Sequence, residues 1–376
     1  MVSIGILGGT FDPVHVEHVR LAKCAIKELG LNKLLVMPTF LSPHKTTNPA
    51  PAKDRFAMLK KAFEGVNEVE VSDFEILKEG KSYTYQTVEH FSKTTNAKLY
   101  FIVGGDMLTD FKTWRNPDRI LKACTLAVFD REDFFTDYDS EAEYFKAQFN
   151  AQFVRLSYKG KSFSSTKIRV YSAFGLPIDH LIDGKIAEYI KNTRLYTCDK
   201  YIEYIKKVLP LKRLKHTADV VITALNKVKE LSLDREKVMI SATLHDCAKY
   251  FNPTFFPNFE LPSDLPQPVV HAFLGEYIAR TVLGVNDAEI LDAVKYHTSG
   301  KPNMSTLAKL VFVANMVEEG RTYDGVETLR ALYEKSDFDA CFKECLKEEV
   351  LHLINKKQYI YSATLDAYEY YCNKNK

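Results

Sequence analysis

The sequence has little of what a secreted, membrane-spanning or nucleic-acid-binding protein needs. Its seven cysteines are odd in number and widely scattered, which is typical of reduced thiols rather than of a disulfide framework. No apolar run approaches the length of a transmembrane helix, and no charged leader precedes the first apolar segment. The 51 basic and 49 acidic residues leave a formal charge of +2, which gives no general argument for nucleic-acid or membrane binding. We therefore expect a cytoplasmic protein with small-molecule substrates.

Length and composition predict more than one globular domain. A chain of 376 residues is longer than one ordinary hydrophobic core supports, which suggests two or three domains. With 46% hydrophobic and 27% charged residues, its composition is that of a folded globular protein. Strand-like and helix-like segments alternate in the first half, whereas the second half has only long amphipathic helical segments. No low-complexity linker separates the halves, so we place the domains at residues 1–197 and 198–376.

The first stretch that carries chemistry is VSIGILGGTFDPVHVEHVR, residues 2–20. A short apolar run breaks at Gly8 and Gly9, which let the backbone turn sharply and approach a ligand closely. His15 and His18 follow three residues apart, so at helical spacing their imidazoles share one face. A helix N-terminus presents unpaired N–H groups that suit a polyphosphate. The stretch predicts a phosphate-binding turn, and the alternative is a plain strand, turn and helix with two solvated histidines.

The rest of the first half predicts a parallel sheet with ligands above the carboxyl ends of its strands. We expect an amphipathic helix over 54–63, an alternating strand over 69–76 and a further helix with Thr84 near its cap. The segment KLYFIVGGDML places Asp106 at the carboxyl end of another strand. Lys45 lies in a polar loop, where it is as readily solvated as held near an anion.

Taken in order, these motifs resemble those of the bacterial nicotinate-nucleotide adenylyltransferases, which belong to the nucleotidylyltransferase superfamily. The matching segments are GGTFDPVHxxH, SPHK, KDRFAML, EGKSYTYQT, GGDML and FSSTKIR, together with the only tryptophan of the chain. The resemblance implies a Rossmann-like α/β domain. It also implies transfer of the adenylyl group of ATP to nicotinate mononucleotide, with release of pyrophosphate and with Mg²⁺ as the metal.

The same resemblance assigns roles to the matched positions. It implies that catalysis rests on four residues, His15, His18, Lys45 and Arg169. ATP is implied to contact the first turn and the last motif through Gly8, Gly9, Thr10, Phe11, Ser164, Ser165 and Thr166. Nicotinate mononucleotide is implied to contact Thr84, Asp106 and Trp114. The indole is expected to stack on the pyridine ring, although an isolated tryptophan is more often a core or rim aromatic.

One position departs from the adenylyltransferase pattern. Glu17 stands where the family has a glycine that lets the nucleotide lie against the helix. A carboxylate at this position is expected to obstruct or repel ATP. Another substrate, such as nicotinamide mononucleotide or phosphopantetheine, is the alternative, although Thr84, GGDM and Trp114 favour nicotinate mononucleotide.

The second half predicts an all-α bundle that holds histidines where its helices should be apolar. His245 is followed directly by Asp246 near the end of an apolar helix. Burying both would cost several kcal/mol unless each were paired or ligated. Imidazoles and carboxylates from separate helices are suitable ligands for Fe, Mn or Zn. We therefore predict a metal site, against the alternative of ordinary structural histidines.

The pattern resembles the HD phosphohydrolase superfamily, specifically its bacterial members that cleave diadenosine tetraphosphate symmetrically. The matching segments RLKH, LHDCAK, VVHAF and YHTSGKPNM lie within residues 205–333. The resemblance implies a metal set of His216, His245, Asp246, His271, His297 and Asn315. It further implies that phosphate contacts Arg213 and Lys249.

Asn315 is the departure in this domain, because the family usually has aspartate there. An asparagine carbonyl coordinates without a negative charge, so we expect metal affinity to fall. The expected activity is hydrolysis of dinucleoside polyphosphates. The alternative is a nucleotide-binding or regulatory module without turnover.

Overall fold

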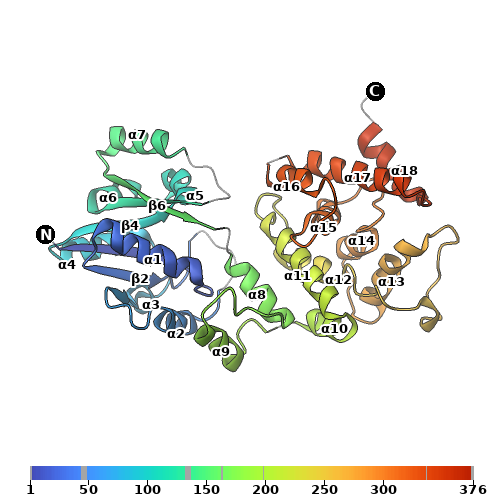
Figure 1. The fold of residues 1–376 in the computed structure, drawn as a ribbon, viewed down its shortest axis with the longest axis horizontal. Helices are drawn as coiled ribbons and strands as arrows, with labels where there is room; N and C mark the ends of the chain where they lie inside the picture. Colours follow the sequence, from blue (N-terminus) through green and yellow to red (C-terminus); the bar gives the residue numbers. More distant parts are fainter. Residues whose placement is uncertain are drawn as a thin grey trace. The chain divides into compact units, whose positions relative to one another are not determined.

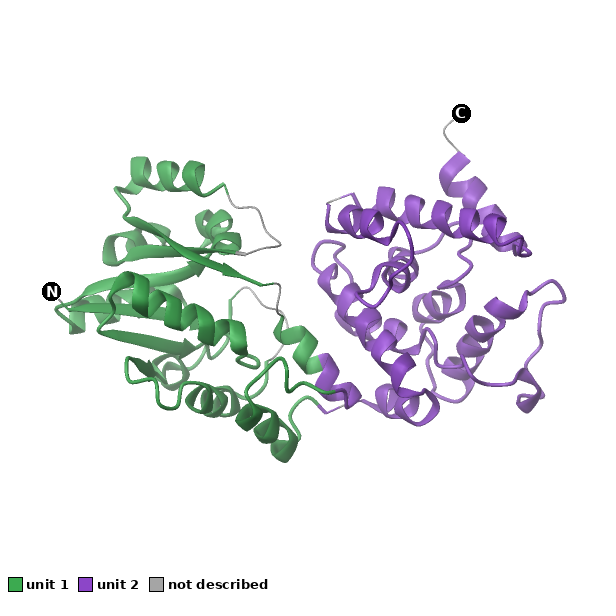
Figure 2. Cartoon of the chain, in the orientation of Figure 1, with its two compact units in different colours: residues 1–169, 177–196 green, residues 170–176, 197–376 purple. Residues whose placement is uncertain are grey.

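The chain forms two compact units in the computed structural model (Figure 2). Unit 1 comprises residues 1–169 and 177–196, and unit 2 comprises residues 170–176 and 197–376. The expected division into domains at residues 1–197 and 198–376 stays a prediction. The structure describes residues 2–43, 49–131, 137–161, 164–197, 199–335 and 337–373, which is the whole chain apart from short gaps.

Unit 1 is built on a six-stranded parallel sheet in the order β3-β2-β1-β4-β5-β6 (Figure 1). The strand order reverses between β1 and β4, so a crevice opens above the carboxyl ends of these two strands. The fold confirms the expected Rossmann-like sheet. The strands are β1 (Ser3–Gly9), β2 (Lys33–Pro38), β3 (Val69–Val71), β4 (Lys98–Gly104), β5 (Thr125–Arg131) and β6 (Phe153–Gly160).

Helices connect the strands and cover the sheet. Near-continuous apolar runs in β1, β2 and β4 are buried, as expected for parallel strands covered on both faces. The helices of this part are α1 (Val16–Leu29), α2 (Ala52–Ala62), α3 (Phe74–Lys78), α4 (Thr84–Thr94), α5 (Gly105–Thr109), η1 (Phe111–Thr113), α6 (Pro117–Ala123), α7 (Tyr138–Phe149), α8 (Ser165–Phe174) and α9 (Gly184–Thr193).

The strand expected over 69–76 is wrong beyond Val71. The observed β3 is short and pairs only with β2, and the chain then turns into α3. Ser72 Oγ accepts a hydrogen bond from the main-chain N–H of Phe74, which favours a turn over a continued strand. The alternating apolar residues of this segment therefore belong partly to β3 and partly to the start of α3.

The regular elements in the described part of unit 2 are all helices, as predicted. Its central helix α15 is apolar on every side and packs against α11, α12, α14, α16 and α17. No helix in the described chain is both long enough and apolar enough to cross a membrane. The elements are α10 (Lys200–Val208), α11 (Leu211–Asn226), α12 (Arg235–Leu244), η2 (Pro253–Phe255), α13 (Gln267–Thr281), α14 (Ala288–Tyr296), α15 (Thr306–Val317), α16 (Val326–Glu334), α17 (Phe338–Asn355), α18 (Ser362–Tyr368) and η3 (Glu369–Asn373).

Candidate active site and metal centre

A cavity of about 520 Å³ opens above the carboxyl ends of β1 and β4 in unit 1. This volume lies within the range of pockets that bind small molecules, about 300–1,000 Å³. The structure places all but one of the predicted site residues of this unit along it, namely Gly8, Gly9, Thr10, Phe11, His15, His18, Thr84, Asp106, Trp114, Ser164, Ser165, Thr166 and Arg169. Lys45 lies outside the described residues.

One end of the cavity is formed by the turn from β1 into α1. His15 is the residue before the first helical residue, and its main-chain N–H donates to Nδ1 of His18 at 3.2 Å. The centroids of the two imidazole rings are 3.8 Å apart, so both rings face the same end of the cavity. A Cβ atom at Gly9 would lie 3.0 Å from the ring of Phe11, so a larger residue here would require that ring to shift.

The last sequence motif docks on the same turn. Ser165 Oγ donates to the main-chain oxygen of Pro13 at 3.0 Å. Arg169 Nη1 donates to the main-chain oxygen of Asp12 at 2.6 Å, and its Nη2 donates to Thr166 Oγ1 at 3.0 Å. The first turn of α8 and the loop before α1 are therefore held together as one side of the cavity.

Arg55 is a structural support that sequence reasoning missed. It is 1% exposed and donates to the main-chain oxygens of Thr10 at 2.8 Å, Phe40 at 3.1 Å and Ala50 at 2.8 Å. Burial lowers the pKa of the Arg55 guanidinium, while the charge of Asp12 opposes this change. The only signal in the sequence was its place in KDRFAML, because no local pattern marks an arginine that joins the turn after β1 to the connection from β2 to α2.

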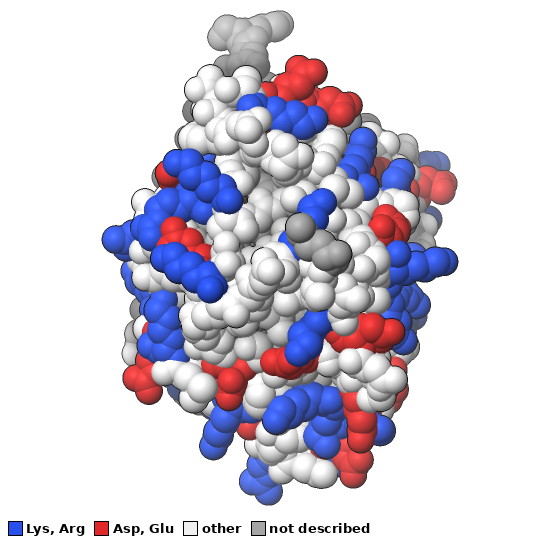
Figure 3. Space-filling view, turned by 90° about the vertical axis from the view of Figure 1, so that its left-hand side faces the viewer, with Lys and Arg blue, Asp and Glu red and all other residues white. Residues whose placement is uncertain are grey.

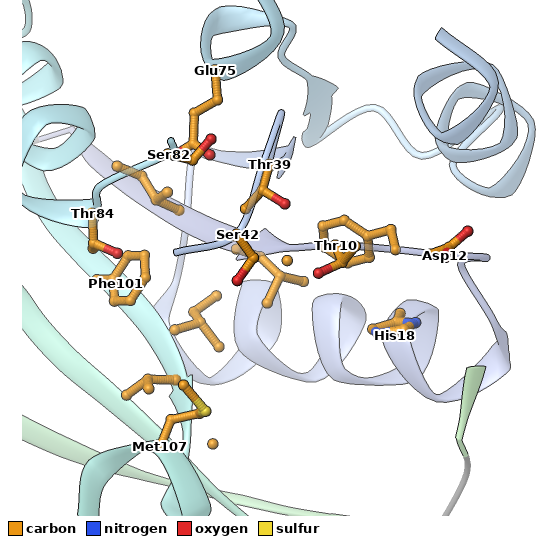
Figure 4. A pocket seen from close by; sticks show the side chains of 18 of the residues that line it. Thr10, Asp12, His18, Thr39, Ser42, Glu75, Ser82, Thr84, Phe101 and Met107 are labelled. Carbon is orange, nitrogen blue, oxygen red and sulfur yellow. The ribbon is translucent and has the colours of Figure 1, made fainter. Parts of the chain in front are cut away.

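The other end of the cavity is aromatic. Trp114 lies directly after η1, with its ring centroid 4.9 Å from that of Phe111 and 6.2 Å from that of Phe101. Thr84 is the first residue of α4 and lies beside Phe101 in the close-up (Figure 4). His18 lies at the opposite side of the same view. The cavity thus joins a histidine-rich end to an aromatic end.

Glu75 is a second residue that the sequence did not reveal. It lines the aromatic half of the cavity, is 7% exposed and accepts a hydrogen bond from Thr87 Oγ1 at 2.7 Å. Burial raises the pKa of its carboxyl group, and the contacts with Thr87 and Ser82 oppose this effect. The expected strand over 69–76 concealed it, because a strand gives no reason to look for a buried acid at this position.

Glu17 is turned away from the cavity. Its side chain is not among those that line the cavity, and its Oε2 atom accepts from Tyr158 Oη at 2.6 Å and from the main-chain N–H of Lys161 at 3.1 Å. Oε1 pairs with Arg20. This carboxylate therefore contacts Tyr158, Lys161 and Arg20 rather than the cavity, and its expected obstruction of ATP stays a prediction.

In unit 2 the predicted histidines converge around Asp246. His216 comes from α11, His245 and Asp246 follow α12, His271 lies in α13 and His297 follows α14. Two groups of metal-type ligand atoms result, each within 4.8 Å, and they share Asp246. Asp246 Oδ2 lies 3.4 Å from His245 Nε2, whereas Oδ1 lies 3.0 Å from His271 Nε2.

Main-chain and carboxylate acceptors fix which imidazole nitrogen faces the centre. Nδ1 of His245 donates to the oxygen of Ala242, and Nδ1 of His297 donates to the oxygen of Val294, both at 2.7 Å. A carbonyl oxygen only accepts, so each Nδ1 carries the proton and each Nε2 presents a lone pair. Nδ1 of His216 faces Glu318 Oε1 at 3.0 Å, which turns its Nε2 inward as well.

The electrostatics keep these ligands in the forms that a metal requires. Burial lowers the pKa of His216 to about 4 and that of His297 to about 3, so both imidazoles are neutral near pH 7. Arg213 Nη1 lies 2.8 Å from Asp246 Oδ2, and this permanent positive charge favours the ionised form of the Asp246 carboxyl group. Neutral imidazoles around an ionised carboxylate are a suitable donor set for a divalent transition metal.

The centre also contains a cluster of cationic side chains. Arg213 Nη1 donates to Asp246 Oδ2 at 2.8 Å, and Lys249 Nζ lies 3.2 Å from Nε2 of His271. Asn315 Oδ1 accepts from Arg321 Nη2 at 2.6 Å, which leaves one lone pair of that amide oxygen for a metal. The structure therefore gives Asn315 a guanidinium partner that the sequence did not suggest.

Comparison with known proteins agrees with this geometry. A cytidylyltransferase-like family model matches residues 6–170, and an HD-domain model matches residues 213–320. A Mycoplasma genitalium protein described as a probable nicotinate-nucleotide adenylyltransferase/Ap4A hydrolase is 30% identical over 325 residues, which cover 85% of this chain and 88% of that protein. A probable nicotinate-nucleotide adenylyltransferase of Clostridium botulinum is 37% identical over 198 residues, covering 52% of this chain and 98% of that protein.

A solved structure resembles the second half only weakly. It is described as a predicted HD superfamily hydrolase involved in NAD metabolism from Clostridium acetobutylicum, with 28% identity and a TM-score of 0.42. It covers 47% of this chain and 97% of its own, and this likeness adds nothing to the assignment. The family assignment rests on the sequence relatives, because the match to the Mycoplasma genitalium protein extends over both units. The chain belongs to the nicotinate-nucleotide adenylyltransferase family, in the form that continues into a C-terminal HD domain.

Proposed function

We propose that unit 1 transfers the adenylyl group of ATP to nicotinate mononucleotide, giving nicotinate adenine dinucleotide and pyrophosphate. The observation that carries this proposal is a single cavity with two chemically different ends. Glycines, histidines and the start of α8 suit a triphosphate at one end, and Trp114 suits a pyridine ring at the other. The names of the relatives from Mycoplasma genitalium and Clostridium botulinum support the same assignment.

The substrate brings its own nucleophile in this reaction. A phosphate oxygen of nicotinate mononucleotide bonds to the α-phosphorus of ATP, and the bond from that phosphorus to the pyrophosphate oxygen breaks. The protein therefore has to position the two phosphates and neutralise developing charge. We propose that His15, His18, Lys45 and Arg169 do so, with Mg²⁺ on the triphosphate.

The remaining residues of the cavity are proposed to orient the substrates. Backbone groups of residues 8–11 and the hydroxyls of residues 164–166 line the cavity, and we propose that they hydrogen-bond the ATP phosphates. Thr84 and Asp106 would hold the ribose nicotinate part while Trp114 stacks on its ring. Glycine at position 9 and the buried Arg55 keep the turn in shape for this purpose.

We propose that unit 2 hydrolyses dinucleoside polyphosphates such as diadenosine tetraphosphate. The four histidines with Asp246 and Asn315 would hold Fe or Mn, or alternatively Zn, and the fit rests on three inward-facing Nε2 lone pairs. Such a metal polarises a phosphate and lowers the pKa of water. Arg213 and Lys249 flank the centre and would balance the phosphate charge.

Small molecules are the proposed substrates of both units, with no nucleic-acid or membrane partner. On the face shown in Figure 3, the blue Lys and Arg side chains alternate with red Asp and Glu side chains, without a continuous basic stripe. Six cysteines in the described chain are free thiols, which supports the proposed cytoplasmic location.

Reciprocal variants of the full chain test both activities. His18→Ala should lower pyrophosphate release from ATP and nicotinate mononucleotide by about 10²-fold or more, as for loss of a group that stabilises transition-state charge. It should leave diadenosine tetraphosphate hydrolysis unchanged. His297→Ala should do the reverse and lose metal. Two activities that fall together in either variant, or that persist in both, would contradict the assignment of one reaction to each unit.

A further inference from the structure

The side chain of Glu17 joins α1 to the end of β6. It is 7% exposed, and one oxygen accepts from both the hydroxyl of Tyr158 and the main-chain N–H of Lys161. The Tyr158 hydroxyl also reaches the main-chain oxygen of Glu17 at 3.2 Å. Arg20, one turn along the helix, pairs with the other carboxylate oxygen. Both carboxylate oxygens are thus occupied by protein donors.

A second carboxylate makes a similar link farther along the same helix. Glu28 accepts from the main-chain N–H of Ser157 at 2.8 Å and from the Ser157 hydroxyl. Residues 17 and 28 are eleven positions apart, which is about three helical turns, so both lie on one face of α1. Glu28 differs from Glu17 in being exposed and in contacting β6 nearer its middle.

The Glu17 link lies close to the segment that lines the cavity. Lys161 is three residues before Ser164, and residues 164–166 and Arg169 line the cavity. From the other direction, Ser165 and Arg169 bond the main chain of Pro13 and Asp12, just before α1 begins. The segment is therefore attached to the start of α1 on both sides.

We propose that Glu17 is a positioning residue for ATP, which sets the place of the residue 164–169 segment by holding Lys161 and Tyr158 against α1. The proposal rests on the function proposed for unit 1. It reverses the expectation that a carboxylate in place of glycine obstructs the nucleotide. Glu17 contacts no substrate in this account and acts only through the segment it holds.

A carboxylate suits this position better than a neutral side chain. Glu17 is in the first turn of α1, where a negative charge interacts favourably with the helix N-terminus. Burial alone would raise its pKa, but the donors Tyr158, Lys161 and Arg20 lower it below the usual range. An ionised carboxylate accepts stronger hydrogen bonds than a neutral group, so the link is firm.

Steady-state kinetics of the full chain test the proposal. Glu17→Ala should raise KM for ATP by about tenfold, as expected for the loss of hydrogen bonds to a charged group, while KM for nicotinate mononucleotide changes by less than about twofold. Glu17→Gln keeps an acceptor oxygen and most of the size, and should restore KM for ATP to within about threefold of wild type. Glu28→Ala is the matched control and should leave both KM values unchanged.

Two results would overturn the proposal. Glu17→Ala with an unchanged or lower KM for ATP would mean that the carboxylate does not position ATP or that it obstructs it. Equal rises of both KM values in Glu17→Ala and Glu28→Ala would mean a general structural role. A direct titration with α,β-methylene-ATP, which resists cleavage at the α-phosphorus, separates this proposal from the proposed function. A wild type that binds this analogue but forms no nicotinate adenine dinucleotide from ATP and nicotinate mononucleotide sinks the proposed function. The ratio of the dissociation constants of wild type and Glu17→Ala for the analogue then decides the role of Glu17.

Discussion

Replacing Arg55 by methionine tests how far the cavity of unit 1 depends on buried main-chain hydrogen bonds. Arg55 is 1% exposed and donates to the oxygen of Thr10, after β1, and to the oxygens of Phe40 and Ala50, both in the connection from β2 to α2. Methionine fills much of the same space but donates nothing. Three partly buried carbonyl oxygens therefore lose a partner at once.

The size of the effect follows from these contacts. A hydrogen bond to a charged group contributes about 1.5–3 kcal/mol, so three such bonds set an upper limit of about 9 kcal/mol. Burial of the guanidinium costs free energy and offsets part of this, as its lowered pKa indicates. We expect Arg55→Met to reduce the free energy of unfolding of unit 1 by about 3–5 kcal/mol, the range for breaking a buried charged network.

Urea unfolding followed by tryptophan fluorescence measures this loss in unit 1 alone, because Trp114 is the only tryptophan of the chain. Arg119→Met is a suitable control, since Arg119 pairs with Glu89 at an exposed site, where the loss of stability should be much smaller than in Arg55→Met. An Arg55→Met variant that loses less than about 1 kcal/mol and binds ATP like the wild type would refute the reasoning.

Four further predictions concern single residues. Nicotinate mononucleotide should quench the fluorescence of Trp114, and Trp114→Ala should raise KM for this substrate by roughly tenfold, the effect of losing one stacked ring; an unchanged KM would exclude stacking. Glu318→Gln should weaken metal binding by about 10–100-fold, measured as metal retained after dialysis, because Glu318 holds Nδ1 of His216; full retention would contradict this. Asn315→Asp should increase the metal content of the purified chain, and equal content in variant and wild type would show that the missing charge is unimportant. Burial raises the pKa of Glu75, so the folded state binds more protons than the unfolded state above the usual glutamate pKa, and stability falls as pH rises through that window. Glu75→Gln should flatten this slope in urea titrations at several pH values, and an unaltered slope would assign it to other groups.

The arrangement of the main elements could be predicted because it depends on patterns that are local in sequence. Apolar runs with glycines at their carboxyl ends predicted β1 and β4, and helical periodicity predicted α11 to α15. The adjacent His245 and Asp246 predicted a shared centre, because two polar residues at a buried helix end need partners from other helices.

The directions of individual side chains could not be predicted in the same way. Glu17 was identified as a departure from the family, but its orientation depends on Tyr158 and Lys161, which lie more than a hundred residues away in sequence. Arg55 joins the turn after β1 to the connection from β2 to α2, and only the folded chain brings these two segments together. Glu318 follows Asn315 by three residues in the sequence, yet its contact with His216 depends on the packing of α15 against α11.

The segment after β3 shows a different limit. Alternating apolar and polar residues over 69–76 fit a strand and equally fit a short strand followed by a helical turn. The hydrogen bond to Ser72 and the short pairing of β3 with β2 favour the helical turn over a longer strand. The alternation of apolar and polar residues indicates neither of these contacts. As a consequence, the buried Glu75 beside the aromatic end of the cavity was missed.

Product analysis of the purified full chain tests most directly whether unit 1 joins two mononucleotide units in one cavity. The chain is mixed with ATP, nicotinate mononucleotide and Mg²⁺, and the products are separated and counted. We predict nicotinate adenine dinucleotide and pyrophosphate in equal amounts, with no product when nicotinate mononucleotide is left out. Absence of the dinucleotide, in a preparation that binds α,β-methylene-ATP, would contradict the account.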